Sequence, residues 1–310
     1  MKTLSFRFAV GLLLAAVSVS GFASTFVVGA ALTKSAHVSP EVLAFLRFAV
    51  AGVVMGLPLL ASSRERARLR SLTRRDALSI LWLGPVGTSL MAWFVFLGCA
   101  RVSTANASMA DALTPIMIFL ASFAKTRRAH ASELVALACG LLGASLVIQI
   151  VTLDGLALAA YSMGDVYIML AAATWGVYKV YGHDTISRLG SSLFTCLTML
   201  AGAAVLGLFL PFLDLAWPTT TSAWGLMAVL AFVSTLLPFW TWNAAQKYLP
   251  MSVLGICAYF TPVVAIVLGI VFLGESVSPL QWLGTAFVVL SGFLAVRHEC
   301  GSSLYSRRRN

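Results

Sequence analysis

The chain has 310 residues, of which 60% are hydrophobic and only 10% are charged, and its mean hydropathy is +0.93. An average soluble domain carries about 25% charged residues, so these values exclude a water-soluble globular protein. The 21 Lys and Arg residues outnumber the 11 Asp and Glu residues and give a net charge of +10. In a soluble protein this excess would indicate a nucleic-acid partner, but in so apolar a chain membrane topology is the first explanation.

Ten nearly charge-free windows are long enough to cross a bilayer, whose apolar core needs about 20 residues of helix. Because lipid offers no water to backbone groups, and because runs such as Ala228 to Val233 show no strand-like alternation, each window is predicted to be helical. The sequence therefore predicts an all-α integral membrane protein with ten transmembrane helices and short connectors. In chain order the windows are residues 8–30, 40–61, 77–99, 102–124, 134–153, 163–182, 191–213, 222–243, 250–273 and 279–296.

The first window also resembles a cleavable signal peptide, because Lys2 and Arg7 precede it and mostly small residues occupy 21–24. The apolar stretch continues to Ala31, which is longer than a typical signal-peptide core. We therefore expect an intact first helix.

The basic residues sort to one side of the predicted helices. Cytoplasmic loops concentrate Lys and Arg, and 18 of the 21 basic residues fall at the termini or in the even-numbered connectors. Both termini are therefore predicted to be cytoplasmic, and the Arg64–Arg75 cluster is expected to contact anionic lipid headgroups rather than nucleic acid. The 18 residues are Lys2, Arg7, Arg64, Arg66, Arg68, Arg70, Arg74, Arg75, Lys125, Arg127, Arg128, Lys179, Arg188, Lys247, Arg297, Arg307, Arg308 and Arg309.

An internal repeat divides the chain into two halves. The segment Thr88–Trp93, with Thr114 and Pro115 downstream, recurs 147 residues later as Thr235–Trp240, with Thr261 and Pro262 downstream. Because each half has an odd number of predicted helices, the second half is expected to be inverted in the membrane, an architecture typical of secondary transporters. We predict five-helix repeats at residues 1–153 and 154–298, followed by a basic cytoplasmic tail at 299–310.

Several segments resemble the drug/metabolite transporter superfamily, specifically the EamA-type transporters. The resemblance covers both halves and implies a ten-helix carrier that exports or imports amino acids, their derivatives or related metabolites. Two departures are Ser20 and Gly21, where the family commonly shows Trp and Gly, and Arg127 and Arg128, where the second half has Gly274 and Glu275. The matching residues are Phe45, Leu46, Arg47, Trp175, Gly176, Tyr259, Phe260, Thr261, Pro262, Leu273, Gly274, Glu275, Ser278, Pro279, Leu280, Gln281, Gly284 and Gly292.

Two charged residues lie inside predicted spans, where an unpaired charge is costly. At 1.5 Å per residue, Arg47 lies about 10 Å and Asp111 about 13 Å from the same predicted membrane face, so a salt bridge between them is feasible. One interpretation is structural, in which Arg47 reaches outward and Asp111 neutralises its charge. The other is a substrate or proton site, which the uncharged second-half counterparts Leu197 and Ala258 favour.

Two further groups of residues are candidates for function. Pro115 and Pro262 are placed inside predicted helices, where proline removes a hydrogen bond, so they are either tolerated kinks or hinges for alternating access. Aromatic residues serve either as interfacial anchors or as substrate contacts. With Arg47 and Asp111, the predicted substrate-binding or coupling residues are Trp93, Trp175, Tyr178, Trp240 and Tyr259.

The pattern as a whole predicts a secondary transporter of the inner membrane that exports small metabolites such as amino acids or their derivatives. No GxxxxGK loop is present, so we expect coupling to protons or to exchange rather than to a nucleotide. The alternatives are an importer or exchanger of a nucleotide-, vitamin- or drug-like metabolite and, least favoured, an intramembrane enzyme. No enzyme, cofactor or metal site is expected, because the histidines fall in loops or at helix ends and the cysteines form no CxxC pair. The expected partners are a small-molecule substrate and the bilayer, with the protein as a monomer or homodimer.

Overall fold

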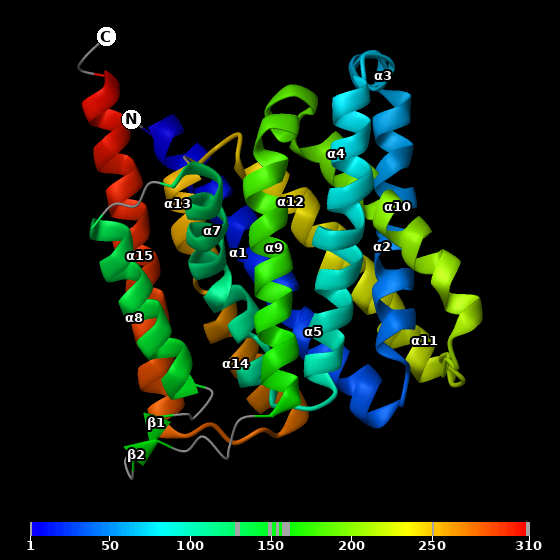
Figure 1. The fold of residues 1–310 in the computed structure, drawn as a ribbon, viewed down its shortest axis with the longest axis vertical. Helices are drawn as coiled ribbons and strands as arrows, with labels where there is room; N and C mark the ends of the chain where they lie inside the picture. The colour runs from blue at the N-terminus through cyan, green and yellow to red at the C-terminus, as the bar shows by residue number, and fades with distance from the viewer. Residues whose placement is uncertain are drawn as a thin grey trace.

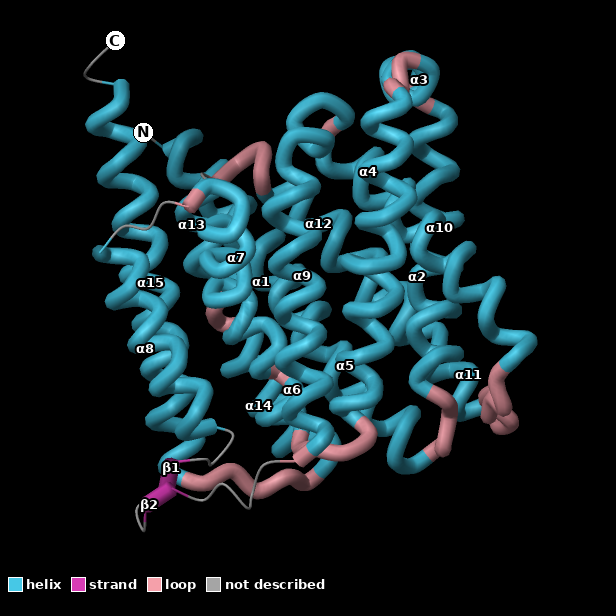
Figure 2. Tube along the Cα trace, viewed as in Figure 1, coloured by secondary structure: helices cyan, strands magenta, loops and turns pink. Residues whose placement is uncertain are grey.

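The structure is a computed structural model that describes residues 2–127, 131–147, 151–152, 155–156, 162–249 and 251–307. Nearly all of the described chain is helical, and the long helices stand side by side in Figures 1 and 2. The first half contains α1 (Lys2–Ala30) with η1 (Ala31–Ser35), α2 (Pro40–Ala61), α3 (Ser63–Arg70), α4 (Arg74–Gly84) with η2 (Pro85–Leu90) and α5 (Met91–Cys99), α6 (Thr104–Ala107), α7 (Met109–Thr126) and α8 (Ala131–Val147).

A short antiparallel pair, β1 (Val151–Thr152) and β2 (Gly155–Leu156), follows α8. The second half contains α9 (Met163–Leu189), α10 (Ser191–Phe209) with the 3-10 turn η4 (Leu210–Phe212), α11 (Thr221–Ala228) with η5 (Val229–Leu236) and α12 (Leu237–Ala245), α13 (Met251–Ala258), α14 (Thr261–Leu273) and α15 (Pro279–Arg307). The segments η1, η2 and η5 are π-helical, so they widen the helices that contain them.

The helices are long and apolar enough for a multi-pass membrane protein. Six stretches of the described chain qualify as candidate spans by length and composition, and shorter apolar helices occupy Ala138–Val147, Thr261–Leu273 and Pro279–Ser291. The helical membrane class is therefore confirmed, while the count of ten spans stays a prediction. The six stretches are Phe6–Ser35, Pro40–Ala61, Arg74–Cys99, Thr104–Lys125, Ser191–Phe212 and Thr221–Ala245.

Two ends of the molecule can be distinguished in Figure 1. At one end, which we call the α3 end, α3 connects α2 to α4, α1 begins and α15 ends. At the opposite end, which we call the β1–β2 end, lie the strand pair and the connections from α5 to α6 and from α14 to α15. The Arg-rich α3 thus shares an end with both termini, and the assignment of this end to the cytoplasm stays a prediction.

The helix pairings exchange between the two halves. Helix α1 of the first half packs against α12 and α14 of the second half. Correspondingly, α9 of the second half packs against α5 and α7 of the first half. Likewise, α2 packs against η5 and α10 packs against η2, while α2 pairs with α10 and α8 pairs with α15. The helices therefore form a first bundle, made of α4–η2–α5, α6–α7 and α9, and a second bundle, made of α1, α11–η5–α12 and α13–α14.

Local backbone features also recur 147 residues apart. Thr73 and Thr220 are both N-caps, and each hydroxyl accepts a hydrogen bond of 3.2 Å from the backbone N–H three residues later. The π-helical segments η2 and η5 follow at overlapping positions of the repeat. Both α7 and α14 end at a left-handed residue, which is Arg127 with φ 57° in one case and Gly274 with φ 65° in the other.

The structure corrects three details of the sequence prediction. The fifth window was extended to residue 153, but α8 ends at Val147 and a strand occupies Val151–Thr152. Pro262 does not interrupt a continuous helix, because it is the second residue of α14. A backbone N–H at that position would make no intrahelical hydrogen bond, so proline costs none. Pro115 does lie within α7, but its side chain is outside the described part of the chain. The sequence predicts only a short connector at 63–70, and in the structure this connector forms the helix α3.

Candidate functional site

The helix pairs α2–α10 and α8–α15 connect the two bundles, which otherwise contact each other mainly in the half of the molecule that contains the β1–β2 end. Among the described residues, the more extensive contacts between them join α1 to α5 and α6, and α14 to α6 and α7. The segments α4, α12 and α13, which lie toward the α3 end, contribute none of these extensive contacts. Contacts that close one end of two helical bundles would block the passage of a solute through that end, so the side chains in this region are candidates for the site.

A carboxylate of the second half crosses this interface. Both Glu275 carboxylate oxygens accept hydrogen bonds from the Thr104 backbone N–H, at 2.8 and 2.9 Å, and Oε1 accepts a third from the Thr104 hydroxyl at 3.0 Å. Glu275 is positioned by the end of α14, because Gly274 is left-handed and the Glu275 N–H donates to the Gly269 carbonyl at 3.3 Å. The contact therefore joins the end of α14 to the start of α6.

Two cations lie beside the same interface. Lys34 Nζ donates to the Val102 carbonyl at 2.6 Å. Arg47 is only 4% exposed, and its guanidinium carbon lies 5.0 Å from the Phe48 ring centroid and 5.9 Å from that of Phe96. The Arg47 side chain is therefore buried within the protein, and both the structural and the functional interpretation of Arg47 stay predictions.

The buried thiol of Cys99 connects these observations. Cys99 is completely buried at the end of α5, where Arg47 lies over Phe96, and the following connector holds both Val102, bonded by Lys34, and Thr104, bonded by Glu275. Gly29 of α1 faces the thiol, because a Cβ atom at Gly29 would lie 3.5 Å from the Cys99 sulfur. Two cations and one carboxylate thus gather where α1, α2, α5 and the α14–α15 connection meet, and such a group of charges can hold an anionic or zwitterionic ligand.

The predicted partner of Arg47 cannot be placed. Asp111 belongs to α7, but its side chain lies outside the described part of the structure. The salt bridge between Arg47 and Asp111 therefore stays a prediction.

Tyr259 lies in the turn between α13 and α14 and is partly buried.

The aromatic candidates separate by environment. The Trp93 indole nitrogen donates to the Glu41 carboxylate at 2.7 Å, so this tryptophan joins α5 to the start of α2. Trp240, the residue matched to Trp93 in the second half, is 70% exposed. An exposed ring suits either a lipid anchor or a cavity wall, so the role of Trp240 as a substrate contact stays a prediction.

Trp175 and Tyr178 form an aromatic pair in which Tyr178 is buried and Trp175 is partly exposed. Their rings stack with centroids 4.9 Å apart, and Tyr178 is 4% exposed. The Tyr178 hydroxyl lies 3.1 Å from the Thr198 hydroxyl, and a Cβ atom at Gly87 would lie 2.2 Å from the Tyr178 ring. Tyr178 therefore packs α9 against α10 and η2. The Lys179 ammonium lies over the Trp175 ring, 4.6 Å from its centroid.

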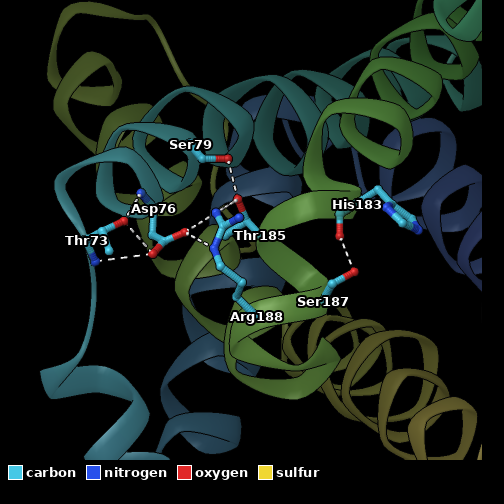
Figure 3. A network of polar contacts seen from close by, with 7 residues as sticks. All are labelled: Thr73, Asp76, Ser79, His183, Thr185, Ser187 and Arg188. Carbon is cyan, nitrogen blue, oxygen red and sulfur yellow. Dashed lines mark hydrogen bonds and ion pairs between the residues drawn. The ribbon is translucent and has the colours of Figure 1, made fainter.

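A second polar network lies at the α3 end, within the first bundle (Figure 3). The Asp76 carboxylate accepts hydrogen bonds from Thr73 and pairs with the Arg188 guanidinium, whose Nε is 3.1 Å from Oδ1. The Thr185 hydroxyl donates to the Ser79 hydroxyl at 3.1 Å. Because α4 and α9 both belong to the first bundle, this network holds that bundle together and does not join it to the second.

Sequence reasoning missed Glu275 and Asp76 as contact-forming residues. Asp76 had a local signal, since Thr73 and Asp76 have the spacing of a capping box. Glu275 had only the resemblance of its neighbours to a family motif, because its partner Thr104 is 171 residues away. The described residues contain no group of three His, Cys, Asp or Glu side chains that could hold a metal ion.

Comparisons with known proteins agree with a transporter. The profile of the EamA-like transporter family matches residues 9–149 and 162–297. The chain is 24% identical to "Uncharacterized transporter YyaM" of Bacillus subtilis over 82% of this chain and 83% of that protein. It is 25% identical to the "Probable terminal-alkyne amino-acid exporter" of Streptantibioticus cattleyicolor over 84% of both chains.

Two further similarities concern location and fold. The chain is 24% identical to "Uncharacterized inner membrane transporter YedA" of Escherichia coli K12 over 81% of this chain and 80% of that protein. A crystal structure with 23% sequence identity superimposes with a TM-score of 0.62 and covers 99% of both chains, so it shares the fold.

Proposed function

The chain belongs to the EamA-like transporter family, and from this premise we propose that it is a secondary transporter that exports small metabolites, amino acids or their derivatives first among them. It is a multi-pass membrane protein, and we place it in the inner membrane with both termini in the cytoplasm. The relative named as an inner membrane transporter supports the location, and the 18 basic residues on one predicted side support the orientation.

The observation that carries this proposal is the exchange of helix pairings between the halves. A pseudo-twofold axis in the membrane plane converts the pairs of α1 with α12 and α14 into the pairs of α9 with α5 and α7. The two separate matches to the family profile and the features that recur 147 residues apart support the same repeats. Inverted halves whose bundles meet mainly at one end suit alternating access, in which the opposite end would close as this end opens.

The charges beside the interface support a ligand with a carboxylate. Arg47 and Lys34 supply positive charge that suits the carboxylate of such a ligand. The relative from Streptantibioticus cattleyicolor carries an amino-acid exporter name, which supports the same class. Trp93 and Tyr259, which are both partly buried, are proposed as apolar contacts for the substrate, with Asp111 as a coupling residue and Pro115 and Pro262 as hinges.

The test begins with metabolite profiling of cells and medium with and without overexpression of the protein. We expect one or a few amino acids or derivatives to accumulate in the medium, and unchanged pools would argue against an exporter. The purified protein is then reconstituted in sealed vesicles, where a carrier moves the identified compound without changing it. Conversion of the compound in detergent would favour the enzyme alternative, and net uptake by cells would favour an importer.

Asp111→Asn distinguishes the functional from the structural interpretation of the buried charges. We expect it to abolish transport while the protein remains folded and monodisperse in detergent, since the amide keeps the shape and removes the charge. The matched control is Asp184→Asn, which neutralises an exposed carboxylate of α9. Equal transport by Asp111→Asn and wild type would remove Asp111 from the site.

A further inference from the structure

Glu275 has the position and the contacts of a gate residue. It lies in the connection after α14, at the end where the two bundles meet. Its partner Thr104 is the first residue of α6 in the other bundle. Among the described residues, the three hydrogen bonds of its carboxylate all go to this one residue. A carboxylate that accepts several charge-assisted hydrogen bonds makes a strong but breakable contact.

The backbone around the contact is shaped to bring the two bundles close. Gly269 has no side chain at the point of approach, and a Cβ atom there would lie 3.0 Å from Glu275 Oε2 and 3.1 Å from Thr104 Cβ. The left-handed Gly274 then turns the chain so that Glu275 faces α6. Both glycines thus serve the contact between Glu275 and Thr104.

The matched position of the first half carries a base instead of an acid. The first-half counterparts of Gly274 and Glu275 are Arg127 and Arg128, so the repeat carries cations where the second half carries a carboxylate. Among the described residues, the extensive contacts between bundles also lie toward the Glu275 side. The acid of the Glu275–Thr104 contact is therefore not repeated in the sequence of the first half.

We propose that Glu275 is the gate residue at the β1–β2 end: its hydrogen bonds to Thr104 hold the two bundles together, and they must break each time the transporter opens there. This inference rests on the proposed alternating access. Within that mechanism, the stability of the Glu275–Thr104 contact sets the balance between the closed and open states at this end.

A native reporter makes the proposal testable without a known substrate. Cys99 is completely buried at the end of α5, faces Gly29 of α1 and precedes Thr104 in the chain by five residues. In protein whose Cys139, Cys196, Cys257 and Cys300 are replaced by Ala, reconstituted in nanodiscs, the rate of maleimide labelling of Cys99 measures how often this end opens. We expect Glu275→Gln to raise the labelling rate about tenfold, as expected when a charge-assisted hydrogen bond is weakened to a neutral one.

Two variants and a control test the assignment. Thr104→Ala removes the hydroxyl and keeps the backbone N–H, so it should raise the rate by less than Glu275→Gln does. Glu275→Asp keeps a carboxylate and should restore part of the protection. The control is Glu65→Gln, which neutralises the partner of Arg68 in α3 at the opposite end and should leave Cys99 labelling unchanged. Equal labelling of Glu275→Gln and wild type, or an equal increase in Glu65→Gln, would overturn the proposal.

A reversible lock separates a gate from a permanent contact. Thr104→Cys and Glu275→Cys are combined in the same background with Cys99 also replaced, and the two thiols are joined by a short bifunctional methanethiosulfonate. Transport in vesicles should stop and should return on reduction, whereas unchanged transport by the locked protein would refute the gate. Labelling that responds to Glu275→Gln in a protein that moves no metabolite would support the gate and reject the proposed function.

Discussion

The two halves of the molecule repeat a backbone but not its chemistry. Thr73 and Thr220 begin matched helices in the same way, and η2 and η5 widen them at overlapping positions. The side chains on this scaffold differ, since Asp76 matches Ala223 and Gly87 matches Ser234. A fold that needs only matched caps, helix lengths and packing can therefore keep its symmetry while each half acquires its own charges, and those unmatched charges are the best candidates for function.

The largest expected effect is on the buried cation that has no counterpart. Arg47→Leu introduces the residue that occupies the matched position 197 of the second half. We expect transport to fall by about 100-fold or more, since a buried charge paired to a substrate or acid contributes several kcal/mol, while folding survives because an apolar side chain suits the site. Vesicle transport and gel filtration measure the two effects, with the exposed-site variant Arg70→Leu as control. Transport at the wild-type rate would show that the asymmetry of charge has no functional meaning.

A second difference between the halves is steric. Gly87 lies against the Tyr178 ring, whereas the matched Ser234 hydroxyl lies 2.7 Å from the Ser24 hydroxyl of α1. Gly87→Ala places a Cβ atom 2.2 to 2.4 Å from Tyr178 atoms, so we expect a loss of about 3 kcal/mol of stability or failure to accumulate in the membrane. Gly225→Ala in α11 is the control, because no atom lies within 4 Å of its Cβ position. Similar unfolding of both variants in a detergent titration would contradict the packing described for Tyr178.

Much of this arrangement follows from sequence periodicity, and the rest depends on how the helices rotate and pack. Apolar windows locate the helices because lipid admits little else, and the repeat is visible because matched residues keep their spacing. Trp93 and Trp240 occupy matched positions, yet one bonds Glu41 and the other is 70% exposed. Their environments differ because the neighbours of α5 and α12 come from distant parts of the chain, as do Arg188, the ion-pair partner of Asp76, and Thr104, the partner of Glu275. No local pattern specifies such contacts.

A smaller effect is expected at the matched N-caps. Thr220→Ala removes one capping bond and should cost about 1 kcal/mol. Thr73→Ala should cost more, since the Thr73 hydroxyl both accepts from the Asp76 N–H and donates to the Asp76 carboxylate at 2.6 Å, and that carboxylate also holds Arg188. Thermal unfolding of the two variants in the same detergent gives the comparison. A larger loss in Thr220→Ala would mean that the network in Figure 3 adds nothing to the cap.

The smallest effect concerns the matched helix ends, where the two halves share a conformation but not a residue. Arg127 is left-handed, which strains a residue with a side chain, whereas Gly274 adopts the same conformation without strain. Arg127→Gly should therefore stabilise the protein by about 0.5–1 kcal/mol, and Gly274→Ala should destabilise it by a similar amount, because no atom crowds its Cβ position and only the backbone changes. Opposite shifts in the unfolding midpoint are the expected result. If Arg127→Gly instead lowers stability, then the arginine makes contacts at the α3 end that outweigh its strain. The first half would then have a polar contact at the α3 end that corresponds to the Glu275 contact at the β1–β2 end.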